Sequence, residues 1–348
     1  MPFPRRRGPG VTLGVCVAAS LAFSQNVQVV NAPSVVMPVL VDSNSPAYWY
    51  DSQFHLVNSS GTSIVTRGAN QFFLNDDELS EEFPVEIDSW DRQPLWIEAT
   101  YLDPDDGRLW AWYHHEPGGI CSGSLTVPEI GAMVSEDGGR TFRDLGIVLS
   151  AADPADCSAR NGFFASGHGD FSVTVQEGYF YFLFTSYGGP VENQGIAMAR
   201  MAFADRFEPA GAVFKYFEGA WAEPGLGGIV TPVFPARVSW AAANTDSYWG
   251  PSIHWNYHIE KYVVLMARSC CEPRWPSEGI YVTSTADLSD PSSWTAPKRI
   301  LSAAEIGYKP GWYPQVLGTA FGDTDSVAGR VSRLYIKGVS DWELIFEP

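Results

Sequence analysis

Short hydrophobic runs, many of them alternating with polar residues or rich in aromatic residues, recur along this chain. Gly, Pro, Asp and Asn bound these runs, and the sequence contains 33 Gly and 25 Pro. Alternation with a period of two is typical of strands with one buried face, and the bounding residues are typical of turns. Long windows with apolar residues at helical spacing are scarce. The pattern therefore predicts an all-β protein built from short strands.

The predicted strands form a repeat along the chain. Five units each combine a first strand, a tight turn and an aromatic-rich second strand, and they begin at Asp42, Glu98, Asp170, Trp249 and Tyr313. Third strands are expected near residues 130–135, 195–200 and 278–284, and fourth strands near 143–149 and 298–301. Four antiparallel strands repeated five times predict a five-bladed β-propeller with four-stranded antiparallel blades.

Two further segments bear on this fold. Residues 26–40 have strand character but no unit of their own, so we expect them to supply a ring-closing strand beside the last blade. Residues 135–142 match the Asp-box pattern S-x-D-x-G-x-T-[FW], a tight turn between the outer strands of a propeller blade that carries no chemistry. A β-sandwich with coincidentally similar hairpins is the alternative fold.

The first 24 residues predict export. Three arginines at positions 5–7 precede an apolar run over 11–23, and small residues stand before a suitable cleavage site at Gln25. This is the layout of a secretory signal peptide, and the run is short for a membrane span. We therefore expect a secreted or periplasmic protein, with residues 25–348 as a single propeller domain and no membrane association after cleavage. The alternatives are an uncleaved anchor and a lipoprotein through Cys16, which bulky Val15 disfavours.

Composition narrows the class of partner. The chain carries 22 Lys and Arg against 40 Asp and Glu, which argues against binding nucleic acid or an anionic membrane surface. Aromatic residues make up 14%, with 13 Trp. Core packing accounts for much of this content, and flat rings also stack on sugars in carbohydrate-binding clefts. We therefore expect a monomer with a carbohydrate partner.

Four cysteines remain after cleavage, namely Cys121, Cys157, Cys270 and Cys271. An even number in an oxidising compartment predicts two disulfides, for which three connectivities exist. Of these we favour Cys121–Cys157, which would join two loops, and a bridge between the adjacent Cys270 and Cys271. The spacing contains no CxxC pair and no neighbouring His cluster, so it does not indicate a zinc site.

The repeat resembles the five-bladed propeller glycoside hydrolases, particularly families 43, 32 and 62. In those enzymes an Asp near the start of the first blade is the general base, and Asp42 matches it. An Asp leading the third blade modulates the acid, and Asp170, within residues 167–171, matches that. Residues 284–288, followed by Trp294, look like a blade-end pattern common in these families. The resemblance covers nearly the whole mature chain and implies a glycosidase fold.

One position departs from this pattern. The arabinan- and xylan-cleaving members carry their general acid in a Glu-Gly-Pro at the fourth blade, where this chain reads Trp249-Gly250-Pro251. Glycoside hydrolysis needs one protonated and one ionised carboxyl, and repulsion among neighbouring carboxyls can keep one of them protonated. We therefore assign Asp42 as base, Glu98 as acid and Asp170 as modulator. The alternative is that these acids cap turns or bind a structural cation.

Other residues are candidates for contacts with sugar hydroxyls or rings. We assign substrate binding to a set of polar and aromatic residues at or near the blade starts: His168, Trp49, Trp249, His254, Arg268 and Gln315. Trp96, Trp255, Trp312 and Arg274 are further candidates. His114, His115 and Glu116 end a strand, and only one of the two His shares the face of Glu116, so we expect no metal site there. No cofactor is required, although a structural cation could occupy the central channel.

The leading hypothesis is a secreted glycoside hydrolase that cleaves a polysaccharide or oligosaccharide by paired-carboxylate catalysis. The missing fourth-blade acid favours an alternative, a non-catalytic glycan-binding propeller. The Asp box prompts a third, a sialidase-like enzyme. Sialidases surround the substrate carboxylate with arginines, and here no arginine leads a unit.

Overall fold

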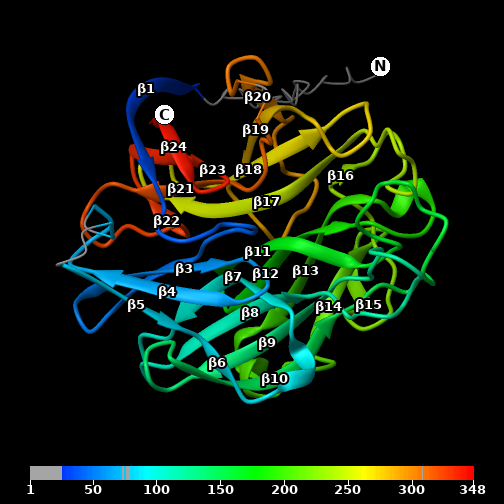
Figure 1. Ribbon diagram of the computed structural model, residues 1–348, viewed down its shortest axis with the longest axis horizontal. Helices are drawn as coiled ribbons and strands as arrows, with labels where there is room; N and C mark the ends of the chain where they lie inside the picture. Colours follow the sequence, from blue (N-terminus) through cyan, green and yellow to red (C-terminus); the bar gives the residue numbers. More distant parts are fainter. Residues whose placement is uncertain (1–25, 73, 76–78, 308) are drawn as a thin grey trace, which may run out of the picture.

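The computed structural model describes residues 26–72, 74–75, 79–307 and 309–348, so the predicted signal peptide at 1–24 lies outside the described residues. The described chain is a five-bladed β-propeller, as predicted, with the five sheets arranged in chain order around a common axis (Figure 1). Three short 3-10 helices, η1 (Trp90–Arg92), η2 (Val191–Asn193) and η3 (Phe203–Phe207), lie in connections. None of the described helices has the length and apolarity needed to cross a membrane.

Each blade has four antiparallel strands, numbered outward from the axis. Blade I contains β2 (Ala47–Tyr50), β3 (Gln53–Ser59), β4 (Ser63–Gly68) and β5 (Ser80–Pro84). Blade II contains β7 (Leu95–Leu102), β8 (Leu109–His115), β9 (Glu129–Ser135) and β10 (Thr141–Leu149). Blade III contains β11 (His168–Gln176), β12 (Tyr179–Ser186), β13 (Gly195–Ala202) and β14 (Val213–Phe217). Blade IV contains β17 (Ser247–Asn256), β18 (Lys261–Ser269), β19 (Ser277–Thr285) and β20 (Lys298–Ser302).

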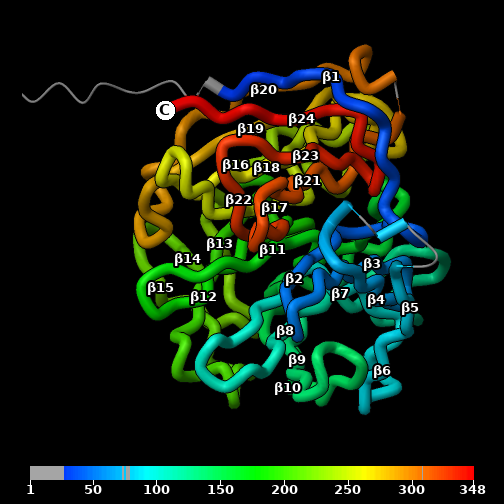
Figure 2. The backbone as a smooth tube through the Cα atoms, turned by 90° about the vertical axis from the view of Figure 1, so that its left-hand side faces the viewer, coloured from blue at the N-terminus to red at the C-terminus, as the bar shows by residue number. Residues whose placement is uncertain are grey.

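Blade V is assembled from both ends of the described chain. It contains β21 (Pro314–Gly318), β23 (Val331–Ile336), β24 (Val339–Glu347) and, as its outer strand, β1 (Asn26–Val36). β1 pairs antiparallel with β24 along most of its length, with Val29 opposite Leu344. Figure 2 shows the two strands side by side. The expected ring-closing strand is therefore confirmed.

Four short strands extend the blades. β6 (Glu86–Ile87) pairs parallel with β10, and β22 (Val327–Ala328) pairs parallel with β17. β15 (Ala220–Pro224) pairs with β14, and β16 (Phe234–Pro235) pairs with β13. Because β22 follows β21 of blade V and joins the inner edge of blade IV, it links two neighbouring blades near the axis.

The core lies between the blades, which explains the aromatic second strands. Every residue of β8 is buried, because neighbouring blades cover both faces of a middle strand. Trp112 of β8 packs against Phe180 and Phe182 of β12, with ring centroids 4.9 and 5.7 Å apart. Similar hydrophobic clusters join blades IV and V and blades I and II. Burying a large side chain contributes about 1.5–3 kcal/mol, so these contacts between blades stabilise the ring.

The turn predicted as an Asp box joins β9 to β10. Asp137 accepts hydrogen bonds from the backbone N–H groups of Arg140 and Thr141 and from the Thr141 hydroxyl, and Ser135 Oγ donates to the same carboxylate. Gly139 has φ of +94°, and a Cβ there would lie 2.3 Å from the Tyr48 hydroxyl. The turn lies at the periphery of blade II, away from the axis.

Both favoured disulfides are present in the structure. Cys121 and Cys157 join the β8–β9 connection to the β10–β11 connection, with Cα atoms 5.5 Å apart. Cys270 and Cys271 are bonded to each other directly after β18. The second bridge therefore lies in the loop that leads to Trp275.

Candidate active site

Irregularities at the start of three inner strands place residues at the axis. The pairing register shifts between Ile97 and Ala99 in β7, between Gly169 and Phe171 in β11, and between Trp249 and Ser252 in β17. The residues of these inner strands that are skipped in the pairing with the second strand include Glu98, Asp170 and Gly250. A bulge of this kind redirects a side chain, and Asp170 has φ of +41°. Gly250 thus occupies in blade IV the place that an acid occupies in blades II and III.

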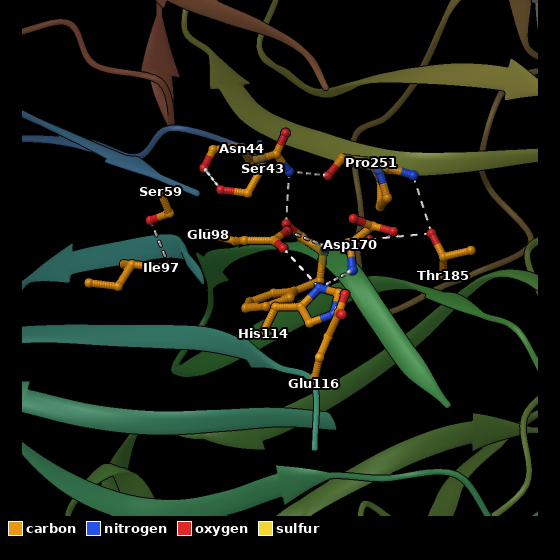
Figure 3. A network of polar contacts seen from close by, with 12 residues as sticks. Ser43, Asn44, Ser59, Ile97, Glu98, His114, Glu116, Asp170, Thr185 and Pro251 are labelled. Carbon is orange, nitrogen blue, oxygen red and sulfur yellow. Dashed lines mark hydrogen bonds and ion pairs between the residues drawn. The ribbon is translucent and has the colours of Figure 1, made fainter. Parts of the chain in front are cut away.

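Hydrogen bonds between inner strands fix these positions (Figure 3). The side-chain amide of Asn44 donates to the carbonyl groups of Phe171 and Pro251, at 2.8 and 2.9 Å, and so joins blades I, III and IV. The backbone N–H of Gly250 donates to Thr185 Oγ1 at 3.2 Å. These bonds provide partners for polar groups that would otherwise be buried without them.

A pocket opens where the inner strands begin. Three of its lining residues are acids, namely Asp42, Glu116 and Asp170. His114 also lines it, and the remaining wall is aromatic, formed by Trp96, Phe163, Phe164, Trp249, Trp275, Trp312 and Tyr313. Carboxyl groups within such a wall sit in a medium of low polarity, where they interact strongly with one another.

Asp42 lies at the open side of the pocket. Its side chain is 41% exposed, and Oδ1 lies 3.3 Å from Nζ of Lys337. Partial burial raises the pKa of Asp42, and the ammonium group of Lys337 opposes that rise. Lys337 in turn lies over the ring of Trp312, with Nζ 4.6 Å from its centroid. The carboxylate of Asp42 is therefore oriented by a cation and still open to solvent.

Glu98 lies behind the pocket wall. Its side chain is 1% exposed, Oε2 accepts a hydrogen bond from the Phe171 N–H at 2.7 Å, and Oε1 lies 3.2 Å from Nδ1 of His114. The bulge in β7 and these two contacts hold the carboxyl in the interior. The sequence-based assignment of Glu98 as the acid that reaches the substrate therefore does not fit the geometry. Burial raises the pKa of Glu98.

His114 lies between two carboxyl groups. Its Nδ1 faces Glu98, and its Nε2 lies 3.4 Å from Oε1 of Glu116, longer than a standard hydrogen bond (Figure 3). Burial alone would lower the pKa of His114, but contacts with Glu116 and Glu98 outweigh it and raise the pKa to about 10. A Cβ at Gly169 would lie 2.6 Å from Cε1 of His114, so only glycine lets β11 approach the ring this closely.

Asp170 is the buried acid of the pocket. Burial, followed by the negative charge of Glu98, raises the pKa of Asp170 to about 7. The Tyr187 hydroxyl donates a hydrogen bond to its Oδ2, which opposes that rise. Near neutral pH the Asp170 carboxyl is therefore poised between its protonated and ionised forms.

The aromatic wall is built by loops as well as strands. Trp275, in the loop after the Cys270–Cys271 bridge, lies 4.9 Å from Phe163 and 5.0 Å from Trp249, measured between ring centroids. It also stacks on Tyr187 at 5.9 Å. Trp275 has φ of +54°, an unusual backbone conformation for a bulky residue, held here by this packing.

One of the six predicted substrate-binding residues lines the pocket, and that residue is Trp249. His168 and His254 are buried elsewhere, where their rings pack against Phe184 and Phe346. Burial lowers the pKa of both imidazoles, that of His254 to about 3. Both rings are therefore neutral parts of the core.

The other three predicted residues have structural partners. Gln315 exchanges two hydrogen bonds with the backbone of Ser45, at 2.6 and 2.8 Å, which joins blade V to blade I. Arg268 makes two hydrogen bonds with the Asp246 carboxylate, and Trp49 Nε1 donates to the Asp323 carbonyl. Among the further candidates, Trp96 and Trp312 line the pocket, whereas Trp255 lines a separate groove.

The sequence analysis did not assign Glu116, His114, Phe163, Phe164, Trp275 and Tyr313 to the site. Alternation along β8 does put His114 and Glu116 on one face, but it does not say which face meets the axis. The aromatic residues of the loops carry no such pattern. The sequence around these aromatic residues therefore does not indicate where they pack.

The described residues contain one buried group whose spacing could suit a metal ion. Ligand atoms of Glu98, His114 and Asp170 lie within 4.8 Å of one another. The carboxyl groups of Glu98 and Asp170 already accept hydrogen bonds from Phe171 and Tyr187, so we do not assign these residues as metal ligands. The second group, Asp246 with Cys270 and Cys271, offers no free thiolate because the cysteines are bonded. The channel cation stays a prediction.

No protein-family model and no curated protein matches this sequence. Solved structures with the same fold do match. A thermostable family-43 glycoside hydrolase superposes with a TM-score of 0.53 and 14% identity over 91% of each chain. A variant of exo-beta-1,3-galactanase from Phanerochaete chrysosporium, bound to beta-1,3-galactotriose, gives 0.50 and 11% over 91% of this chain and 64% of that one.

A third match is the catalytic domain of the Coprinopsis cinerea GH62 alpha-L-arabinofuranosidase, with a TM-score of 0.49, 8% identity and coverage of 93% and 97%. The chain spans 64% of the length of the galactanase structure, so that protein extends beyond the shared region. At these identities the family-43 hydrolase and the galactanase show the fold. The chain has the five-bladed propeller of family 43 glycoside hydrolases, in agreement with the resemblance found in the sequence.

Proposed function

We propose that this chain is an exported glycoside hydrolase that cleaves an O-glycosidic bond of a polysaccharide or oligosaccharide at the axial pocket. One observation carries the proposal: Asp42, Glu116 and Asp170 share a pocket whose remaining wall is almost entirely aromatic. Aromatic faces suit the apolar faces of a sugar ring. Two carboxyl groups in different protonation states suit acid–base cleavage.

Asp42 is our candidate for the general base, because it is open to solvent, where it could activate a water molecule, and is oriented by Lys337. Asp170 is our candidate for the modulating carboxyl. The propeller shared with a family-43 hydrolase and an exo-beta-1,3-galactanase supports a carbohydrate substrate. The two disulfides agree with export to an oxidising compartment.

The test is hydrolysis of a panel of nitrophenyl furanosides and pyranosides by the purified protein. We expect turnover of at least one member, and we expect Asp42→Asn to reduce kcat by ~10²–10⁴-fold, the usual contribution of a general acid or base. Asp51→Asn, in the exposed turn between β2 and β3, is the matched control. A wild-type protein inactive on the panel and on natural oligosaccharides, or an Asp42→Asn variant with full activity, would disprove the proposal.

A non-catalytic glycan-binding propeller is the second candidate. The observation that favours it is Trp249, which stands at the position of the Glu in the Glu-Gly-Pro of the enzymes that the sequence resembles. Under this alternative the protein binds glycans on an array, and substitution of the aromatic wall abolishes this binding. No hydrolysis product forms on prolonged incubation. Turnover that depends on Asp42 decides between the two candidates.

A further inference from the structure

We propose that Glu116 is the general acid of this pocket and that His114, held by buried Glu98, is its positioning residue. The inference rests on the proposed function, and it supplies a donor that the fourth blade lacks. Glu116 directly follows the second strand of blade II, β8, whereas the enzymes that the sequence resembles carry this role at the start of a first strand in another blade.

Access favours Glu116 over the other two acids that could serve. The Glu116 side chain is 28% exposed and lines the pocket, whereas that of Glu98 is 1% exposed and does not. Asp170 lines the pocket, but it is only 3% exposed, and its Oδ2 accepts a hydrogen bond from the buried Tyr187 hydroxyl. With Asp42 as base, Glu116 is therefore the remaining carboxyl of the pocket that a leaving group can reach.

The contacts of Glu116 explain how it would be oriented. Its Oε1 faces Nε2 of His114 at 3.4 Å, which leaves Oε2 for a ligand (Figure 3). The imidazole is itself fixed on three sides: Nδ1 lies 3.2 Å from Oε1 of Glu98 and 3.2 Å from the backbone nitrogen of Asp170, and the ring packs against Trp96 at 5.5 Å. Contacts of this kind are often long in an empty site and shorten when substrate binds.

The step balances without any further reactant. Glu116, supplied with a proton by the facing imidazolium of His114, gives a proton to the glycosidic oxygen as the bond from that oxygen to the anomeric carbon breaks. A water molecule forms the new bond to the anomeric carbon and loses its proton to the Asp42 carboxylate. Release of that proton to solvent and uptake of one by Glu116 restore both groups.

The test compares leaving groups. A 2,4-dinitrophenolate departs without protonation, whereas a methanol or sugar leaving group needs an acid. We expect Glu116→Ala to lose ~10²–10⁴-fold in kcat/KM on a methyl glycoside or oligosaccharide and less than about tenfold on the dinitrophenyl glycoside of the same sugar. Asp105→Asn, in the exposed turn at the opposite end of β8, is the control and should match wild type on both.

The outcomes are distinguishable. Equal losses on the two substrates, or no loss on either, would overturn the role of Glu116 while leaving the proposed function standing. Failure of the wild type on both substrates would overturn the proposed function, and the role of Glu116 with it. A thermal melt of each variant shows whether the fold is intact.

Two variants test the positioning role of His114. The amide nitrogen of Gln can take the place of Nε2, whereas Asn can take only the place of Nδ1. We expect His114→Gln to keep a wild-type ratio of the two activities and His114→Asn to shift that ratio toward that of Glu116→Ala. If the variants change the ratio equally, or if neither changes it, His114 is only a packing residue.

Discussion

Tyr187 donates a hydrogen bond from its hydroxyl to Oδ2 of Asp170, and both side chains are buried. The bond stabilises the ionised carboxyl and so opposes the rise in the pKa of Asp170 that burial causes. Tyr187 directly follows β12 and Asp170 lies at the bulge of β11, so blade III supplies the contact that opposes the effects of burial and of Glu98 from blade II.

Removing that hydroxyl is predicted to raise the pKa of Asp170. Hydrogen bonds to charged groups contribute about 1.5–3 kcal/mol, so Tyr187→Phe should raise the pKa of Asp170 by roughly one to two units. The limb of the pH–activity profile that follows Asp170 then moves to higher pH. Tyr179→Phe, at the other end of β12, should leave the profile in place. An unchanged profile in Tyr187→Phe would show that Asp170 does not control activity.

The raised pKa of Asp170 also predicts how stability depends on pH. Its pKa is about 7 in the folded state and about 3.9 in an unfolded chain, so between these values the native state holds a proton that the unfolded state has lost. The free energy of unfolding contributed by this group therefore falls as pH rises from about 4 to 7. Asp170→Asn removes the contribution.

Relative to wild type, Asp170→Asn should therefore be more stable at pH 7.5 than at pH 5. Thermal melts of both proteins at the two pH values measure this. Buried Lys215, whose pKa burial lowers to about 7, titrates in both proteins and cancels in the comparison. A difference in melting temperature that is independent of pH would contradict the assignment.

Trp312 is predicted to contribute to binding of the sugar ring. Its ring is partly exposed in the pocket wall and supported by Lys337. By analogy with aromatic pairs, which gain about 0.5–1.5 kcal/mol, Trp312→Ala should raise KM by roughly three- to tenfold with little change in kcat. Trp90 is 87% exposed, so Trp90→Ala serves as the control and should change neither KM nor kcat. Loss of kcat alone would indicate a different role.

The two disulfides are predicted to act on different properties. Cys121 and Cys157 are separated by 36 residues, so replacing both by Ser should lower the free energy of unfolding by about 3–4 kcal/mol. The Cys270–Cys271 bridge joins adjacent residues and so closes no long loop, but it lies in the loop that carries Trp275 of the pocket wall. Replacing this pair by Ala should therefore change KM more than stability. Denaturant unfolding and steady-state kinetics on both double variants would separate the effects.

Much of the fold could be predicted because each blade repeats the same local pattern. Turn residues and period-two alternation indicate the strands, and the unpaired strand at 26–40 indicates where the ring closes. The first strands begin a few residues from their predicted starts, and the difference is largest in blade I, where β2 begins at Ala47 and not at Asp42. Before β2, the Asn44 side-chain amide donates hydrogen bonds to backbone carbonyls of blades III and IV. These contacts join residues far apart in the sequence, so no local sequence pattern indicates them.

The site was predictable only where it depends on strand starts. Asp42 and Asp170 begin repeat units, and both line the pocket. Glu98 also begins a unit, but the bulge in β7 holds its carboxyl behind the wall, and no sequence pattern fixes the depth of a side chain. Trp275 reaches the pocket from a loop, so its place depends on packing against residues far away in sequence.

The pairing of β1 with β24 bears on the order in which the blades fold. This contact joins segments near the two ends of the described chain, so its formation must wait until all intervening blades exist. Contacts between such distant segments form slowly, and until they do β24 presents an unpaired edge, where strands of other molecules can add. Closure of the ring would therefore be the last event of folding.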